Sequence, residues 1–158
     1  MINLGFYRDT QRENIYIRPS WIDRVLEVFA LLSWISIWAL AIVFNKRLMQ
    51  HLPWFIWPVF ASITTIVFIY GAYATNRAVK FPFRITDCNH WMQYFWIKKF
   101  VRIWAVIFNF LFLGLMFVGK ETHWELRENF FEYISFGSLI LFIITLCVYY
   151  VMAWRYRL

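Results

Sequence analysis

Four long apolar runs constrain the fold of this chain more than any other feature of its sequence. They cover residues 25–44, 55–74, 103–119 and 134–152, and Glu27 is the only acidic or basic residue inside them. A helix needs about 20 apolar residues to cross a hydrocarbon layer about 30 Å thick. The third run is the shortest, but its apolar character continues upstream through Phe95, Trp96 and Phe100. The runs therefore predict four transmembrane helices.

The overall composition agrees with this prediction. Hydrophobic residues make up 62% of the 158 residues, whereas a soluble domain has roughly 45–50% apolar residues. We expect an all-α integral membrane protein, with a cytoplasmic N-terminal segment at residues 1–20 and a four-helix transmembrane domain at residues 21–158. Residues 1–20 fit either a mobile tail or a strip along the membrane surface. The mixed charge before the first run indicates a retained anchor rather than a cleaved signal peptide.

The basic residues are shared unevenly between the two sides that four spans create. Lys and Arg accumulate on the cytoplasmic side of membrane proteins. The bias therefore predicts that both termini and the second loop are cytoplasmic (N-in/C-in), and it explains a net charge of +7 without a nucleic acid. Twelve basic residues lie on the predicted inner side and four on the outer side: Arg8, Arg12, Arg18, Arg24, Arg77, Lys80, Arg84, Lys98, Lys99, Arg102, Arg155 and Arg157, against Lys46, Arg47, Lys120 and Arg127.

The first helix has a clear start signal. Ser20 suits the N-cap, and Asp23 places an acid in the first turn, near the positive end of the helix. Arg24 and Glu27 are three residues apart, so they can pair on one helix face. That pairing would make Glu27 tolerable near the membrane interface, and a proton-carrying role is the alternative.

The stretch "FPFRITDCNHWMQYFWIKKFVRIW", residues 81–104, is too polar for lipid and unusually aromatic. Pro82 makes a continuous helix unlikely, and Thr86 suits an N-cap. We expect one helix of about 30 residues, about 45 Å long, whose first third projects into the cytoplasmic interface. Lys98, Lys99 and Arg102 fall within an arc of about 100°. This basic flank can contact either lipid phosphates or an acidic partner.

The third loop, "KETHWELRENFFEY", is acidic. Glu121, Glu125 and Glu128 are spaced by three or four residues, so they share one face if the loop is helical. They fit either a solvated surface or a contact with a partner. The histidines are scattered over both sides, and a metal site needs several converging ligands, so neither a metal nor another cofactor is expected. Cys88 and Cys147 are expected to be free thiols.

Asn109 is the only amide inside a predicted span. It can hydrogen-bond to a neighbouring helix or line a substrate path, and the sequence leaves both open. Phosphate loops, nucleophile elbows and zinc-protease motifs are absent from the sequence. No enzyme is therefore indicated.

Two stretches resemble small bacterial membrane proteins of the sporulation-delaying-toxin immunity type. One is "RPSWIDRVLEVFALLSWISIWALAI" at residues 18–42, a first helix entered from a short charged lead. The other is the stretch at residues 81–104, which is similar to the cytoplasmic entry of a later helix in that family. The resemblance covers about a third of the chain. It implies a bacterial cytoplasmic membrane and a non-enzymatic role that works through contact with another protein.

Three classes of function remain in view. The first is an accessory subunit or immunity-type protein that contacts another membrane protein, or a second copy of itself, within the lipid. The second is a transporter or channel component, with Asn109 and Glu27 facing a path. The third is a membrane enzyme that acts on a lipid and uses the basic inner flank. The first is the leading expectation.

Overall fold

Four long helices make up most of the protein. The computed structural model describes residues 1–9, 13, 15–44, 53, 55–117 and 125–157, with the side chains of all except 125–129 and 131. The long helices are α1 (Trp21–Val43), α3 (Ile56–Tyr73), α5 (His90–Phe117) and α6 (Glu125–Arg155). Each is long and apolar enough to cross a membrane. The prediction of four membrane-spanning helices is confirmed, and the chain is a multi-pass membrane protein.

The first helix begins as its sequence predicts. The Asp23 backbone N–H donates to Ser20 Oγ over 3.3 Å, and the Ser20 backbone N–H donates to Asp23 Oδ2 over 2.8 Å. This reciprocal pair is a capping box, which satisfies two backbone donors that the helix itself leaves free. The cap fixes where α1 starts, and so fixes which of its residues face the bundle.

Two helices differ from the expected bounds. Helix α5 begins at His90, a few residues after the proposed Thr86 cap, and a turn fills the interval. The Thr86 backbone N–H does bond to Asn89 Oδ1 at 2.9 Å, but its own hydroxyl accepts no such bond. Helix α6 begins at Glu125, well before the apolar run at 134. Neither Gly nor Pro interrupts residues 125–136, so the helix extends into the acidic loop.

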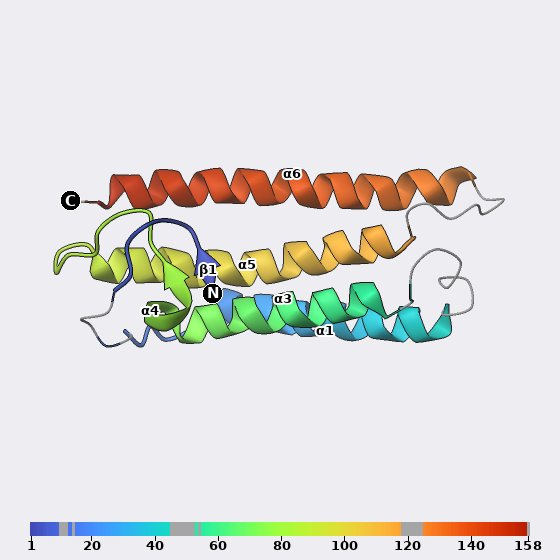
Figure 1. Cartoon of the computed structure of the whole chain (residues 1–158), viewed down its shortest axis with the longest axis horizontal. Coiled ribbons are helices and arrows are strands. Elements are labelled where there is room, and N and C mark those ends of the chain that lie inside the picture. The colour runs from blue at the N-terminus through green and yellow to red at the C-terminus, as the bar shows by residue number, and fades with distance from the viewer. Residues whose placement is uncertain (10–12, 14, 45–52, 54, 118–124, 158) are drawn as a thin grey trace.

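Helix α5 is the centre of the fold. It packs against α1, α3 and α6, while α6 packs mainly on α5. In Figure 1, α6 runs along one side of α5 and the pair α1 and α3 along the other. In the apolar stretch of α5 that can cross the membrane, 56% of the residues are buried inside the protein. In the corresponding stretch of α6, 11% are buried. Most of the surface of α6 therefore lies outside the bundle.

Aromatic side chains fill the core. Trp104 on α5 contacts the rings of Phe68, Phe142 and Tyr149 with centroids 5.7 to 6.2 Å apart. Its indole N–H donates to Thr145 Oγ1 at 3.0 Å. Edge-to-face packing of this kind stabilises beyond the area buried. Trp104 thus ties α3 and α6 to the central helix.

The N-terminal segment crosses one end of the bundle. Strand β1 (Ile2–Asn3) pairs in parallel with β2 (Val79–Lys80), which follows the short helix α4 (Thr75–Ala78). Beyond β1, Tyr7 forms an antiparallel bridge with Phe81. For the described residues this is neither a free tail nor a strip on the membrane surface. The division into a segment at 1–20 and a domain at 21–158 stays a prediction.

Two glycines allow this crossing. A Cβ at Gly5 would lie 2.2 Å from the carbonyl oxygen of Phe81 and 2.3 Å from the Cα of Pro82. A Cβ at Gly71 would lie 2.7 Å from the end of the Ile2 side chain. The absence of a side chain at Gly71 therefore lets the N-terminal segment approach the end of α3 closely.

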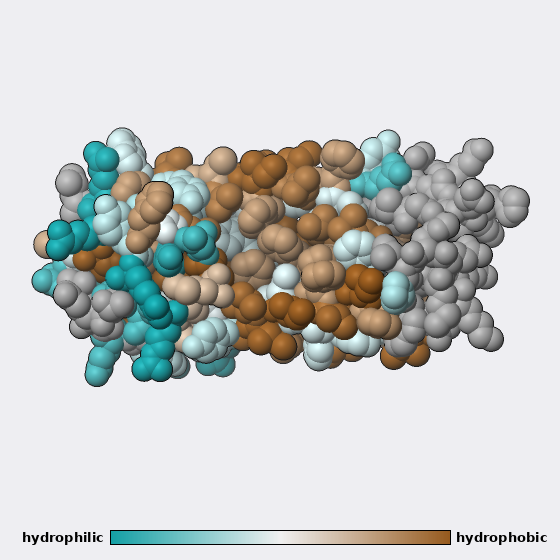
Figure 2. Space-filling model, in the orientation of Figure 1, coloured by the Kyte–Doolittle hydropathy of each residue, from teal (hydrophilic) through white to brown (hydrophobic). Residues whose placement is uncertain are grey.

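The surface divides along the long axis. On the face shown in Figure 2, hydrophobic residues cover the middle of the molecule and hydrophilic residues gather at the end that carries β2 and the C-terminus. This is the end that the distribution of Lys and Arg predicts to be cytoplasmic. The chain enters and leaves the bundle at the same end, as an even number of spans requires.

Candidate functional site

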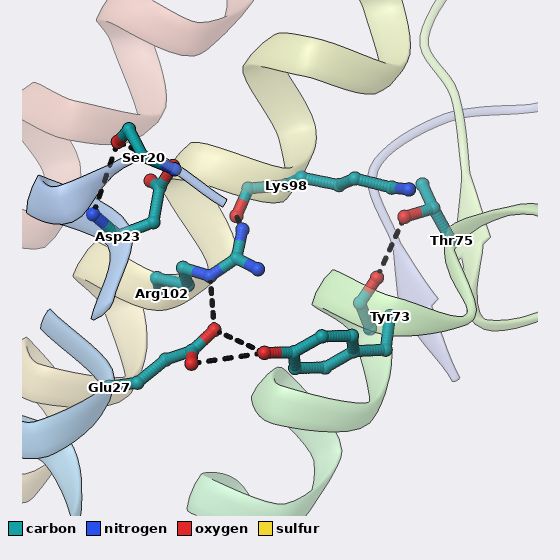
Figure 3. Close-up of polar contacts among 8 residues, drawn as sticks. Ser20, Asp23, Glu27, Tyr73, Thr75, Lys98 and Arg102 are labelled. Carbon is teal, nitrogen blue, oxygen red and sulfur yellow. Dashed lines mark hydrogen bonds and ion pairs between the residues drawn. The ribbon is translucent and has the colours of Figure 1, made fainter. Parts of the chain in front are cut away.

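A cluster of charged side chains lies inside the bundle near its hydrophilic end. Glu27 on α1, Tyr73 on α3 and Arg102 on α5 meet there, as Figure 3 shows. Glu27 lies one helical turn beyond Asp23, so the capping box sets the height at which its carboxylate enters the bundle. We call Glu27, Tyr73 and Arg102 the charged cluster.

The charged cluster is tightly bonded. Arg102 Nε donates to Glu27 Oε1 at 2.6 Å, and the Tyr73 hydroxyl lies 2.9 Å and 3.0 Å from the two carboxylate oxygens. The guanidinium carbon is 5.4 Å from the centre of the Tyr73 ring. Arg102 Nη1 also donates to the Lys98 carbonyl at 2.8 Å. A buried ion pair needs such additional bonds to offset the cost of removing two charges from water.

The partner of Glu27 is not the one that the sequence spacing favours. Arg24 lies three residues before Glu27, but Arg24 is exposed and the ion pair is made by Arg102 instead. The side chain of Arg102 is 5% exposed and that of Glu27 20%. Only a partner on the buried face of another helix reaches a carboxylate that points inward.

The three cations of the expected basic flank separate in the structure. Lys98 and Arg102 are buried, at 5% and 4% exposure, while Lys99 stays partly exposed. Lys98 Nζ donates to the carbonyl of Ile15 in the N-terminal segment. Lys99 Nζ lies 4.9 Å from the centre of the Phe95 ring. An arc of 100° on this central helix spans both a packed and a lipid-facing surface.

The contact between the N-terminal segment and α5 was missing from the sequence analysis. Asp9 is buried, and its Oδ2 accepts a hydrogen bond from the Tyr94 hydroxyl at 3.0 Å. The Tyr150 hydroxyl of α6 donates to the Leu4 carbonyl at 2.7 Å. No local pattern signals these pairs, because 85 and 146 residues separate their members. Tyr94 is fully buried in the core.

Asn109 joins three helices near the middle of the bundle. Its Nδ2 donates to the Ala30 carbonyl at 2.9 Å and to Ser33 Oγ at 3.1 Å, both on α1. Its Oδ1 accepts from Thr65 Oγ1 on α3 at 3.0 Å. The side chain is fully buried. Interhelical hydrogen bonding is thus the observed role of this amide.

The acidic outer residues are only partly placed. Glu121 lies outside the described residues. Glu125 and Glu128 lie in the first turn of α6, so this part of the loop is helical. It stays a prediction that these acidic residues contact a partner or lipid. The same holds for Lys98, Lys99 and Arg102.

Thiols and potential metal ligands are scattered over the described residues. Cys88 and Cys147 are both free, as expected. Within the described parts of the chain, no three His, Cys, Asp or Glu side chains gather closely enough to hold a metal ion. Glu27 and Asn109 instead bond to residues of neighbouring helices. The arrangement joins helices, and it presents its remaining surface to lipid or to a partner.

Comparison with known proteins adds no relative. The chain matches no family model, no curated protein and no solved structure. The four membrane-spanning helices alone therefore define the chain as a multi-pass membrane protein.

Proposed function

We propose that this chain is a small non-enzymatic membrane protein that acts by contact with another protein, as an accessory subunit or an immunity-type protein. The proposal also takes up the expected location, a bacterial cytoplasmic membrane, which rests on the resemblance of residues 18–42 and 81–104.

The exposed surface of α6 is the observation that carries the proposal. This helix packs mainly on α5, and large apolar side chains cover its other faces. Among the described residues of α6 they include five aromatic side chains at 39% exposure or more, in addition to aliphatic ones, and an aromatic surface supplies large and rigid contacts for another helix. The four nearest its two ends are Phe130, Tyr133, Tyr150 and Trp154.

The hydrogen bonds of the polar side chains inside the bundle support a role in protein contact rather than in transport. A transport path would need Glu27 and Asn109 to face a route through the bundle. Both instead bond to neighbouring helices, and Asn109 uses its oxygen and its nitrogen in doing so. The polar groups inside the spans thus serve helix association.

Site-specific photo-crosslinking tests the proposal. A photoreactive residue at Phe136 on the exposed face of α6 should capture one defined second protein in cells of the native host. The same residue at Ile35 on α1 is the matched control, since that side chain is also exposed, at 53% against 68% for Phe136. Capture of lipid alone at both positions would contradict an α6 docking surface.

A further inference from the structure

Two segments that are far apart in the sequence carry three arginines and are held together at the hydrophilic end of the molecule. Arg84 precedes α5, and Arg155 and Arg157 lie at the end of α6. Asn89, which is 2% exposed, holds the two regions together. Its Nδ2 donates to the Arg84 carbonyl at 3.1 Å and to the Arg157 carbonyl at 2.9 Å. One buried amide therefore fixes the distance between the two backbones.

A second buried amide strengthens this junction. Gln93 is 1% exposed, and its Nε2 donates to the Ala153 carbonyl at 2.8 Å. Carbonyl groups in the last turn of a helix have no partner within it. Gln93 therefore caps α6 from α5, one turn beyond Asn89. The backbone positions of Arg155 and Arg157 are set by two side chains, Asn89 just before α5 and Gln93 on α5.

The three guanidinium groups are available at the surface. All three residues are exposed, and none forms an ion pair with a carboxylate of the described residues. Arg157 lies over the Trp154 ring at 4.8 Å, and Arg155 over the Tyr156 ring at 5.9 Å. A stacked guanidinium still presents N–H groups at its edge, where they can bind a phosphate in two places at once.

The surroundings of this patch indicate the membrane border. Trp154 lies near the end of α6 and is 56% exposed. Trp residues of membrane proteins are enriched at the headgroup layer. Among the described residues of 81–89 and 152–157, Asp87 is the one exposed acid, beside the three arginines. We propose that Arg84, Arg155 and Arg157 bind the phosphate of an anionic phospholipid headgroup.

Native mass spectrometry of the full chain tests the site. The protein would be purified in mild detergent and titrated with phosphatidylglycerol or with phosphatidylcholine. We expect phosphatidylglycerol to bind at least about tenfold more tightly, since each cation near an anionic headgroup adds attraction. The variant R84Q/R155Q/R157Q should lose that preference. Its substitutions leave the backbone carbonyls that Asn89 binds, and an unchanged unfolding midpoint would show that the fold is intact.

A matched control variant distinguishes lipid binding at these three arginines from non-specific attraction to the positive charge of the whole protein. The variant R8Q/R18Q/R24Q removes the same charge from exposed residues elsewhere. It should keep most of the preference. Equal losses in both variants, or no preference in the unaltered protein, would overturn the site. Displacement of the lipid by millimolar inorganic phosphate would also overturn it, because it would indicate a soluble anion as the ligand.

Discussion

Glu27 and Arg102 are charged residues that lie within membrane-spanning helices. An ionisable residue inside a span is costly unless it is paired. Here the pair lies 2.6 Å apart and Tyr73 adds hydrogen bonds to the same carboxylate. Three helices therefore depend on one another at this point, since each supplies one member of the charged cluster.

Replacing Arg102 should be costly. Arg102→Gln leaves the Glu27 carboxylate without its cation, and removing one partner of a buried pair costs about 3 to 5 kcal/mol. We expect the lower end, because the Glu27 side chain is 20% exposed. Unfolding in detergent measures the loss, with Lys99→Gln as the control of equal charge change.

A double variant checks the cause of that loss. Glu27→Gln added to Arg102→Gln should recover part of the stability, because no charge is then left buried without a partner. If Arg102→Gln is no more harmful than Lys99→Gln, the ion pair does not stabilise the bundle.

Asn109 leads to a smaller expected effect. Asn109→Leu removes its bonds to Ala30, Ser33 and Thr65, and interhelical bonds in membranes are worth about 0.6 kcal/mol each on average. We therefore expect a loss of about 1 to 2 kcal/mol in the free energy of unfolding. The neighbouring Phe110→Leu, on an exposed side chain, is the control. A more stable Asn109→Leu variant would argue that the amide is kept for another purpose.

The helices are the elements that the sequence predicts best. Apolar runs of sufficient length define four spans, and Ser20 with Asp23 defines the start of α1, because these signals are local. The pairing of Glu27 with Arg102 could not be predicted, since it depends on which faces of α1 and α5 meet. The same holds for Lys98 and Lys99, which are adjacent in sequence but point to different surroundings.

The N-terminal segment is the element with the most specific steric requirement. Gly5→Ala should displace it, because the new Cβ would lie 2.2 Å from a backbone oxygen that cannot move aside easily. A loss of about 1.4 kcal/mol would open the segment tenfold more often. Trypsin cleavage after Arg8, which is exposed, should accelerate accordingly.

Two other glycines provide controls for this experiment. Gly137→Ala on α6 introduces a Cβ with nothing within 4 Å, so cleavage after Arg8 should not change. Gly71→Ala meets only the flexible end of Ile2 and should have an intermediate effect. Equal cleavage rates in all three variants would mean that the segment does not need close contact with Phe81.

The orientation of the whole molecule in the membrane is a prediction from its charge. Cys88 is exposed at the hydrophilic end, which the positive-inside bias predicts to be cytoplasmic. A membrane-impermeant maleimide should therefore label Cys88 in sealed inverted vesicles and not in right-side-out vesicles. Phe55→Cys in a Cys88→Ser background, at the opposite end of α3, should show the reverse pattern. Labelling of Cys88 from the outer face would reverse the topology.

The central claim is that the whole molecule acts through its outer surface, while its internal polar groups hold the helices together. The most direct test is the mass of the particle purified in mild detergent from the native host, with its components identified. The account predicts a complex that contains a second protein at fixed stoichiometry. A lone monomer, or an assembly of this chain alone, would contradict it.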